Sequence, residues 1–187
     1  MIVLATVFLG VSLSACTHGP ARPSRPASGG TASMPLSLRC SDSVGQQGQD
    51  HETVVGGVEG LVLPGSNDPA GLVPVRTGDS TRYYIYKAFL AVSAAAAPFA
   101  TVAITRPAGA RLWYGSPSRI GDLLATGSGQ ALVAASRTSV RLPVCGPRFT
   151  GFVGGIIVPG PACVTFEVSS PVARAATVRV PIGPGRC

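Results

Sequence analysis

Val164-Thr165-Phe166-Glu167-Val168 alternates apolar with polar side chains, and this stretch decides the fold class. Successive side chains of a β-strand point to opposite faces, so strict alternation predicts a strand with one buried face and one exposed face. The same period of two recurs at residues 139–144 and 177–182. The C-terminal third of the chain therefore predicts antiparallel strands that are packed on one side.

The rest of the chain carries the same kind of pattern in shorter pieces. With 24 Gly, 17 Pro and no long amphipathic helical pattern, the sequence favours short strands joined by turns. Residues 81–92 predict a long strand, and the uncharged residues 90–105 predict strand, turn at 95–99 and strand, with a short helix as the alternative. Residues 120–124 predict one helical turn. Roughly nine to eleven strands predict an all-β fold, an antiparallel β-sandwich that is immunoglobulin-like or jelly-roll-like.

An apolar run without charge, residues 2–13, lies at the N-terminus. It is too short to span a bilayer, which takes about 20 residues, and a short apolar core followed by small residues is typical of a secretory signal peptide. Ser14 and Ala15 are small, and Cys16 follows them. This order of residues predicts export.

Leu13-Ser14-Ala15-Cys16 resembles the lipobox of bacterial lipoprotein precursors. The resemblance implies cleavage before Cys16, a diacylglyceryl group on its thiol, and attachment to the outer face of the cell membrane. Two acyl chains suffice for durable anchoring, since each buried methylene contributes about 0.8 kcal/mol. Such precursors carry Lys or Arg before the apolar core, and this chain has none. The alternative is an ordinary signal peptide with an incidental cysteine.

Three segments follow from these observations. They are a signal peptide (1–15), the lipidated cysteine with a linker rich in Pro, Ser and Gly (16–37), and a β-sandwich domain (38–187). Residues 163–168 and 178–183 also loosely resemble uncharacterised secreted proteins of actinobacteria, and that resemblance implies no activity.

Four further cysteines lie in the predicted domain: Cys40, Cys145, Cys163 and Cys187. An even number of cysteines in an exported domain predicts two disulfides. Three connectivities are possible. Because a single strand separates Cys145 from Cys163, and Cys40 and Cys187 lie at the two ends of the domain, we expect the pairs Cys145–Cys163 and Cys40–Cys187.

The net charge of +7 is unevenly distributed along the chain. Residues 17–39 carry +3, residues 40–81 carry −5, and residues 82–187 carry +9. The acidic segment can fold over a basic face of the later strands, or that face can meet anionic lipid headgroups or wall polymers. The plainer reading is a solvated surface. No recognition motif for nucleic acid is present, so we expect no nucleic-acid partner.

No residues predict catalysis, a metal site or a cofactor. The two histidines are His18 in the linker and His51 in a polar loop, and no G-x-S-x-G sequence accompanies them. The chain has no C-x-x-C pair, and its dispersed acids do not match a calcium-binding loop. We therefore expect a protein without enzymatic activity, with an envelope hydrolase that uses His51 as the alternative.

Five of the eleven aromatic residues are interleaved with basic residues in two strand segments: Tyr83, Tyr84, Tyr86, Trp113 and Tyr114, with Arg82, Lys87 and Arg111. If their outward members adjoin, Tyr83, Tyr86, Trp113 and Arg111 form a face for a glycan ring or a protein partner. The alternative is that these rings belong to the core, since strands favour aromatic residues.

The sequence therefore predicts a membrane-anchored surface lipoprotein that binds an envelope protein or a wall glycan. A structural spacer without a discrete ligand is a further alternative.

Overall fold

The computed structural model describes residues 34–45, 54–61, 72–76, 82–125, 129–184 and 187. The described residues belong to one compact unit, Ser33–Cys187. The predicted signal peptide, Cys16 and the linker up to residue 33 lie outside the described residues.

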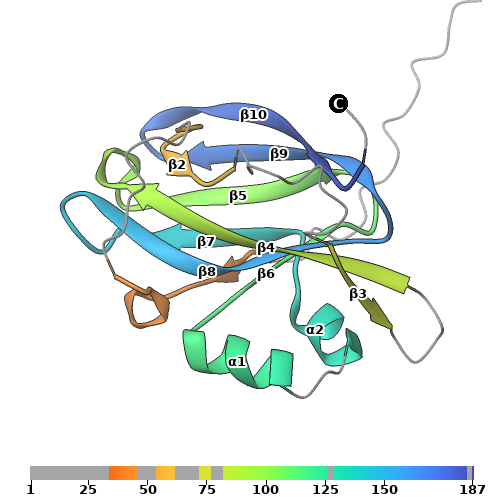
Figure 1. The fold of residues 1–187 in the computed structure, drawn as a ribbon. Helices are drawn as coiled ribbons and strands as arrows, with labels where there is room; N and C mark the ends of the chain where they lie inside the picture. The colour runs from red at the N-terminus through yellow and green to blue at the C-terminus, as the bar shows by residue number, and fades with distance from the viewer. Residues whose placement is uncertain (1–33, 46–53, 62–71, 77–81, 126–128, 185–186) are drawn as a thin grey trace, which may run out of the picture. The chain divides into compact units, whose positions relative to one another are not determined.

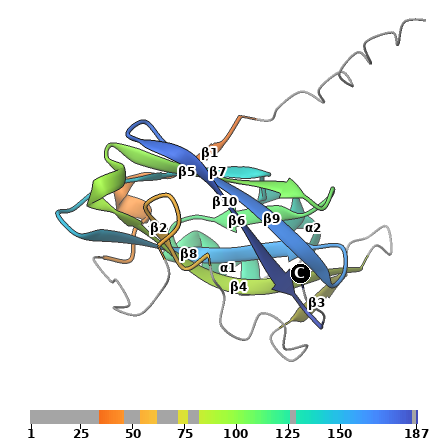
Figure 2. The same cartoon turned by 90° about the horizontal axis from the view of Figure 1, so that it is seen from above.

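Two five-stranded sheets build this unit and pack face to face (Figure 1). Sheet A has the order β1 (Leu36–Ser37), β7 (Ser139–Pro143), β5 (Phe99–Arg106), β9 (Ala162–Ser170), β10 (Ala173–Ile182). Sheet B has the order β2 (Val58–Glu59), β4 (Arg82–Ser93), β8 (Phe149–Val158), β6 (Arg111–Tyr114), and β3 (Val73–Arg76) also pairs with β4. Seen from above, β9 and β10 cross obliquely over β4 and β8 (Figure 2). The predicted all-β sandwich is confirmed.

The alternation seen in the sequence produces the core between the sheets. Val164, Phe166 and Val168 of β9 are fully buried, whereas the intervening Glu167 is exposed. From the face that points toward sheet A, sheet B contributes large apolar side chains such as Leu90 and Phe152 to the same cluster. Burial of a Val, Leu or Phe side chain stabilises the fold by about 1.5–3 kcal/mol each, so this shared layer holds the two sheets together.

The uncharged segment 90–105 forms strand, turn and strand, as predicted. β4 ends at Ser93, a short 3-10 helix follows at Ala94–Ala96, and β5 begins at Phe99. Ser93 begins this turn because its side chain accepts a hydrogen bond of 3.2 Å from the Ala95 N–H. Of the short helix that was the alternative, only these three 3-10 residues are present.

Two helices form a third layer on the face of sheet B that points away from sheet A (Figure 1). The predicted helical turn at 120–124 lies inside α1 (Pro117–Ala125), which is longer than expected. The second helix, α2 (Gly129–Ala135), was not predicted. Within the described residues, no helix has the length and apolar character needed to cross a membrane.

The disulfides pair differently from our expectation. Cys40 is bonded to Cys145 and Cys163 to Cys187, with Cα–Cα distances of 5.6 and 5.3 Å, so the expected pairs Cys145–Cys163 and Cys40–Cys187 are wrong. The reason is that β1 pairs in parallel with β7, Leu36 opposite Val140, which brings the residues that follow both strands together.

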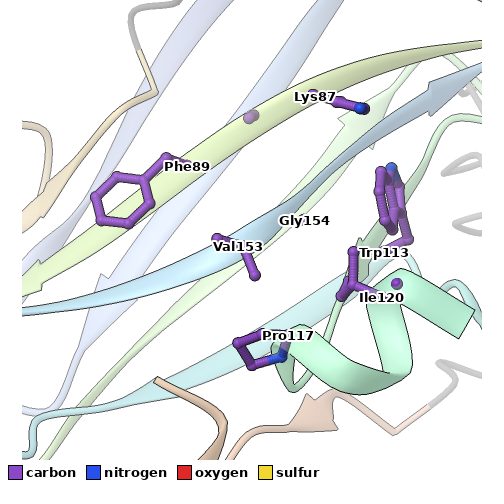
Figure 3. Close-up of a pocket in the computed structure, with 9 residues that line it drawn as sticks. Lys87, Phe89, Trp113, Pro117, Ile120, Val153 and Gly154 are labelled. Carbon is purple, nitrogen blue, oxygen red and sulfur yellow. The ribbon is translucent and has the colours of Figure 1, made fainter. Parts of the chain in front are cut away.

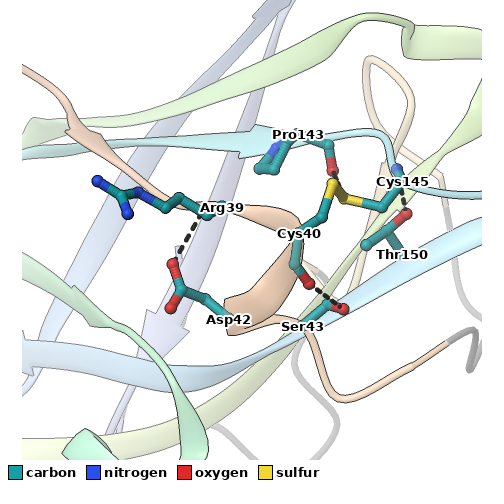
Figure 4. The surroundings of a disulfide bond; sticks show 7 residues. All are labelled: Arg39, Cys40, Asp42, Ser43, Pro143, Cys145 and Thr150. Atoms are coloured by element: carbon teal, nitrogen blue, oxygen red, sulfur yellow. Dashed lines mark hydrogen bonds between the residues drawn. A yellow bond between two sulfur atoms is a disulfide. The ribbon is translucent and has the colours of Figure 1, made fainter.

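Hydrogen bonds fix the chain around the first disulfide (Figure 4). Cys40 begins a short 3-10 helix, Cys40–Asp42, in which the Arg39 N–H donates to the Asp42 carboxylate at 2.8 Å. On the other side, the Cys145 N–H donates to the hydroxyl of the buried Thr150 at 2.8 Å. The second disulfide follows from the β9–β10 hairpin, where Cys163 lies opposite Pro181, close to the C-terminal Cys187.

Candidate functional site

A pocket of about 520 Å³ lies between the outer face of sheet B and helix α1 (Figure 3). Its lining is mainly apolar and comes from four elements, β4, β8, β6 and α1: Lys87, Ala88, Phe89, Trp113, Pro117, Ile120, Gly121, Val153 and Gly154. The exposed Lys87, Pro117 and Gly121 stand at its rim, and the buried Trp113 and Ile120 form its wall.

The pocket is bordered by a second, smaller hydrophobic cluster outside the main core. Ile85, Ile157 and Trp113 of sheet B pack there against Ile120 of α1 and Leu132 of α2. These strand residues have the parity opposite to the residues that face sheet A, so sheet B is apolar on both of its faces. The two helices are the cover that this outer face needs.

Strand register sets the positions of the pocket side chains. Phe89 of β4 lies opposite Val153 of β8, and Lys87 lies opposite Gly155. Gly155 in turn lies opposite Trp113 of β6. Lys87, Gly155 and Trp113 therefore form one row across the outer face of sheet B.

Glycines of β8 make room for aromatic rings from the neighbouring strands. A Cβ at Gly155 would lie 2.5 Å from Trp113 Nε1, and a Cβ at Gly151 would collide with the ring of Phe89. On the inner face, a Cβ at Gly154 would collide with Tyr114. The rings occupy the space that side chains at these positions would fill, which explains why a buried central strand contains three glycines.

Two buried polar atoms have no hydrogen-bond partner among the described residues, Trp113 Nε1 and Tyr114 Oη. Tyr114 lies in the core between the sheets, where burial raises the pKa of its hydroxyl far above the usual value. Trp113 Nε1 lies on the other face, over Gly155 and next to the pocket. Among the described residues that line the pocket, Lys87 is the one that is charged, so this part of the site combines an apolar wall with one cation and one N–H donor that has no described partner.

The structure brings some of the predicted ligand residues together and separates others. Tyr83 packs against the outer cluster, and Arg111, opposite Ile157, belongs to the same face of sheet B. Trp113 is also on this face but is only 2% exposed. Tyr86 lies on the opposite face, where it packs against the main core and where burial raises its pKa.

The strands therefore do not present an exposed platform made of Tyr83, Tyr86, Trp113 and Arg111. The pocket uses Trp113 as a wall, with residues that the sequence analysis did not single out, such as Phe89, Ile120 and Val153. The parity of residues 81–92 carried a usable signal, because Ile85, Lys87 and Phe89 share one face and two of these are large and apolar.

The residues on which other kinds of site would depend are mostly outside the described part of the chain. His18 and His51 both lie outside the described residues, as does Cys16, the residue expected to be lipidated. Among the residues with described positions, no three His, Cys, Asp or Glu side chains gather in a way that would hold a metal ion.

The sequence matches no protein-family model, and searches of curated proteins and of solved structures find no significant match either. The site is therefore interpreted from its own geometry.

Proposed function

We propose that this protein is a membrane-anchored surface lipoprotein whose β-sandwich binds a small ligand in the pocket between sheet B and α1. The observation that supports the proposal is the pocket itself, about 520 Å³ in volume and lined by Phe89, Trp113, Ile120 and Val153. Small-molecule sites typically have volumes of about 300–1,000 Å³, apolar walls and few polar groups.

The lining favours an apolar ligand over the wall glycan expected from the sequence. A glycan presents many hydroxyl groups, each of which needs a hydrogen-bond partner when it is buried. Of the described residues that line the pocket, Lys87 and Trp113 have side chains that offer hydrogen bonds. A ligand with a mostly apolar body loses less by entering such a pocket.

Replacing Gly121 with leucine should close the pocket without harming the fold. A Cβ at Gly121 meets no atom within 4 Å, so a longer side chain can extend from α1 into the pocket. Removing a helical glycine should also stabilise α1 by roughly 0.5–1 kcal/mol. We expect the neutral fluorescent probe N-phenylnaphthylamine to bind the wild-type domain at one site, and at least tenfold more weakly to Gly121→Leu.

The matched control is Ala125→Leu, which adds three carbons where Gly121→Leu adds four, on the same helix at an exposed position that does not line the pocket. It should bind the probe as the wild type does. Equal binding by both variants, or no binding by the wild type, would remove this pocket as the functional site.

Anchoring is a separate part of the proposal. Support comes from the lipobox resemblance of Leu13-Ser14-Ala15-Cys16. Cys16→Ser removes the thiol that would carry the diacylglyceryl group, and with it the two acyl chains that hold the protein at the bilayer. We expect the full-length variant to move from the membrane fraction to the soluble exported fraction of a bacterial host.

Ser14→Ala is the matched control, because it keeps both the cysteine and a small residue at the cleavage site; it should stay membrane-bound. Membrane retention of the Cys16→Ser protein would show that another element holds it.

A further inference from the structure

The chemistry of the ligand can be inferred from the row Lys87, Gly155, Trp113 on the outer face of sheet B, granted the proposed function of the pocket. Lys87 and Trp113 lie on either side of Gly155, and the indole nitrogen of Trp113 lies over this glycine. Figure 3 shows the indole nitrogen at the end of the ring that points toward Lys87. Both residues line the pocket.

Lys87 and Trp113 are both hydrogen-bond donors in the lining of the pocket. Trp113 Nε1 is buried with no partner among the described residues, and an unsatisfied buried donor costs about 1–3 kcal/mol. Lys87 cannot relieve it, since an ammonium group donates hydrogen bonds and accepts none. An acceptor from outside the chain would satisfy the indole and the ammonium group together.

The positive charge of Lys87 also favours an anionic ligand. No described acidic side chain lines the pocket, and no ion pair joins Lys87 to another described residue. Lys87 is the single lysine among the 15 basic residues of the chain. A neutral acceptor would receive a hydrogen bond from the ammonium group, but an anionic acceptor also gains the attraction between opposite charges, so an anion gains most at this position.

We infer that the pocket binds an amphiphile with one anionic group, a carboxylate or a phosphate, that lies between the Lys87 ammonium and the Trp113 N–H. The apolar body of the ligand packs against Phe89, Ile120 and Val153. A fatty carboxylate and a single-chain lipid phosphate share this chemistry.

Trp113 is the only tryptophan of the chain, so its fluorescence reports directly on the pocket. The full domain is titrated, below the micelle concentration, with four probes of equal chain length: dodecanoate, dodecyl phosphate, dodecanol and dodecyltrimethylammonium. We expect at least one of the two anions to bind tenfold more tightly than dodecanol, and the cation to bind most weakly. The tighter of the two anions identifies the headgroup.

Lys87→Gln should lower the affinity for the preferred anion about tenfold, to the level of dodecanol, which corresponds to about 1.4 kcal/mol. Binding of dodecanol and of N-phenylnaphthylamine should not change, because these neutral molecules make no ionic contact. Lys87→Arg should retain most of the preference. Arg119→Gln removes the same charge from an exposed position of α1 outside the pocket lining and should leave every affinity within twofold.

A second readout is independent of fluorescence. Lys87 carries the only side-chain amine, and the preferred anion should protect it from acetylation. Equal binding of dodecanol and both anions, or unchanged anion binding by Lys87→Gln, overturns the inference. In either case, binding of N-phenylnaphthylamine that Gly121→Leu abolishes would leave the proposed function standing. Absence of binding by all probes would overturn both.

Discussion

Replacing Cys40 and Cys145 together with alanine should lower the free energy of unfolding by about 4.7 kcal/mol. The bond joins residues 105 positions apart, so it removes a large part of the conformational entropy of the unfolded chain. It also ties the short strand β1 to the end of β7. Urea unfolding of the oxidised domain measures the effect.

The matched control is the double replacement of Cys163 and Cys187. That bond spans only 24 positions, so the same chain-entropy model gives a smaller loss, about 3.5 kcal/mol. Peptide mapping without reduction should yield the pairs Cys40–Cys145 and Cys163–Cys187. Linked peptides that contain Cys145 and Cys163, or a greater loss for the C-terminal pair, would contradict the arrangement.

Trp113→Ala should cost about 3–5 kcal/mol of folding free energy, as truncation of large buried aromatic residues generally does. The ring is 2% exposed and holds α1 against sheet B through its contacts in the outer cluster. The ring lies over Gly155, which has no side chain that could fill part of the space left by truncation. Thermal or urea unfolding, followed by circular dichroism, measures the loss.

Two comparisons separate packing from surface effects. Trp113→Phe keeps an aromatic ring and should cost less than half as much as the alanine variant. Arg111→Ala changes a partly exposed residue of the same strand and should cost less than about 1 kcal/mol. If Trp113→Ala costs no more than Arg111→Ala, the ring does not support the fold and the exposed platform expected from the sequence becomes the better description.

The strand patterns could be predicted because each depends only on its own residues. The alternation of Val164, Phe166 and Val168 with Thr165 and Glu167 specifies one buried face whatever the strand pairs with. The sequence also shows the glycines of β8, but it does not show why this strand contains them. Only the neighbouring strands show that Trp113 and Tyr114 fill the space above Gly155 and Gly154.

The sequence could not predict which strands pair with each other. β1 has only two residues, Leu36 and Ser37, and it joins β7 in parallel across about a hundred positions of the chain. Nothing local in either segment encodes that choice, and the disulfide connectivity depends on it. This is why the expected pairs were wrong although the four cysteines and the number of bonds could be predicted.

For a similar reason, the sequence could not predict the two helices that cover sheet B or the pocket beneath α1. α1 has nine residues and α2 has seven, and helices this short are marginal in isolation whatever their sequence. These helices form because the outer cluster around Trp113 and Ile157 needs a cover. The sequence showed that both faces of β4 carry apolar residues, but it did not show which segment returns to cover the outer one.

The order of the cysteines has a consequence for the maturation of the chain. Within the domain, each disulfide joins cysteines that follow one another in the sequence, Cys40 with Cys145 and Cys163 with Cys187. If the chain is exported N-terminus first, as proposed, its thiols emerge in that order. Pairing of each newly exposed thiol with the one still unpaired, by the oxidant of an oxidising compartment, would then produce the native bonds directly. Acylation of Cys16 would protect this sequence of events, because it removes the one earlier thiol that would otherwise compete for Cys40.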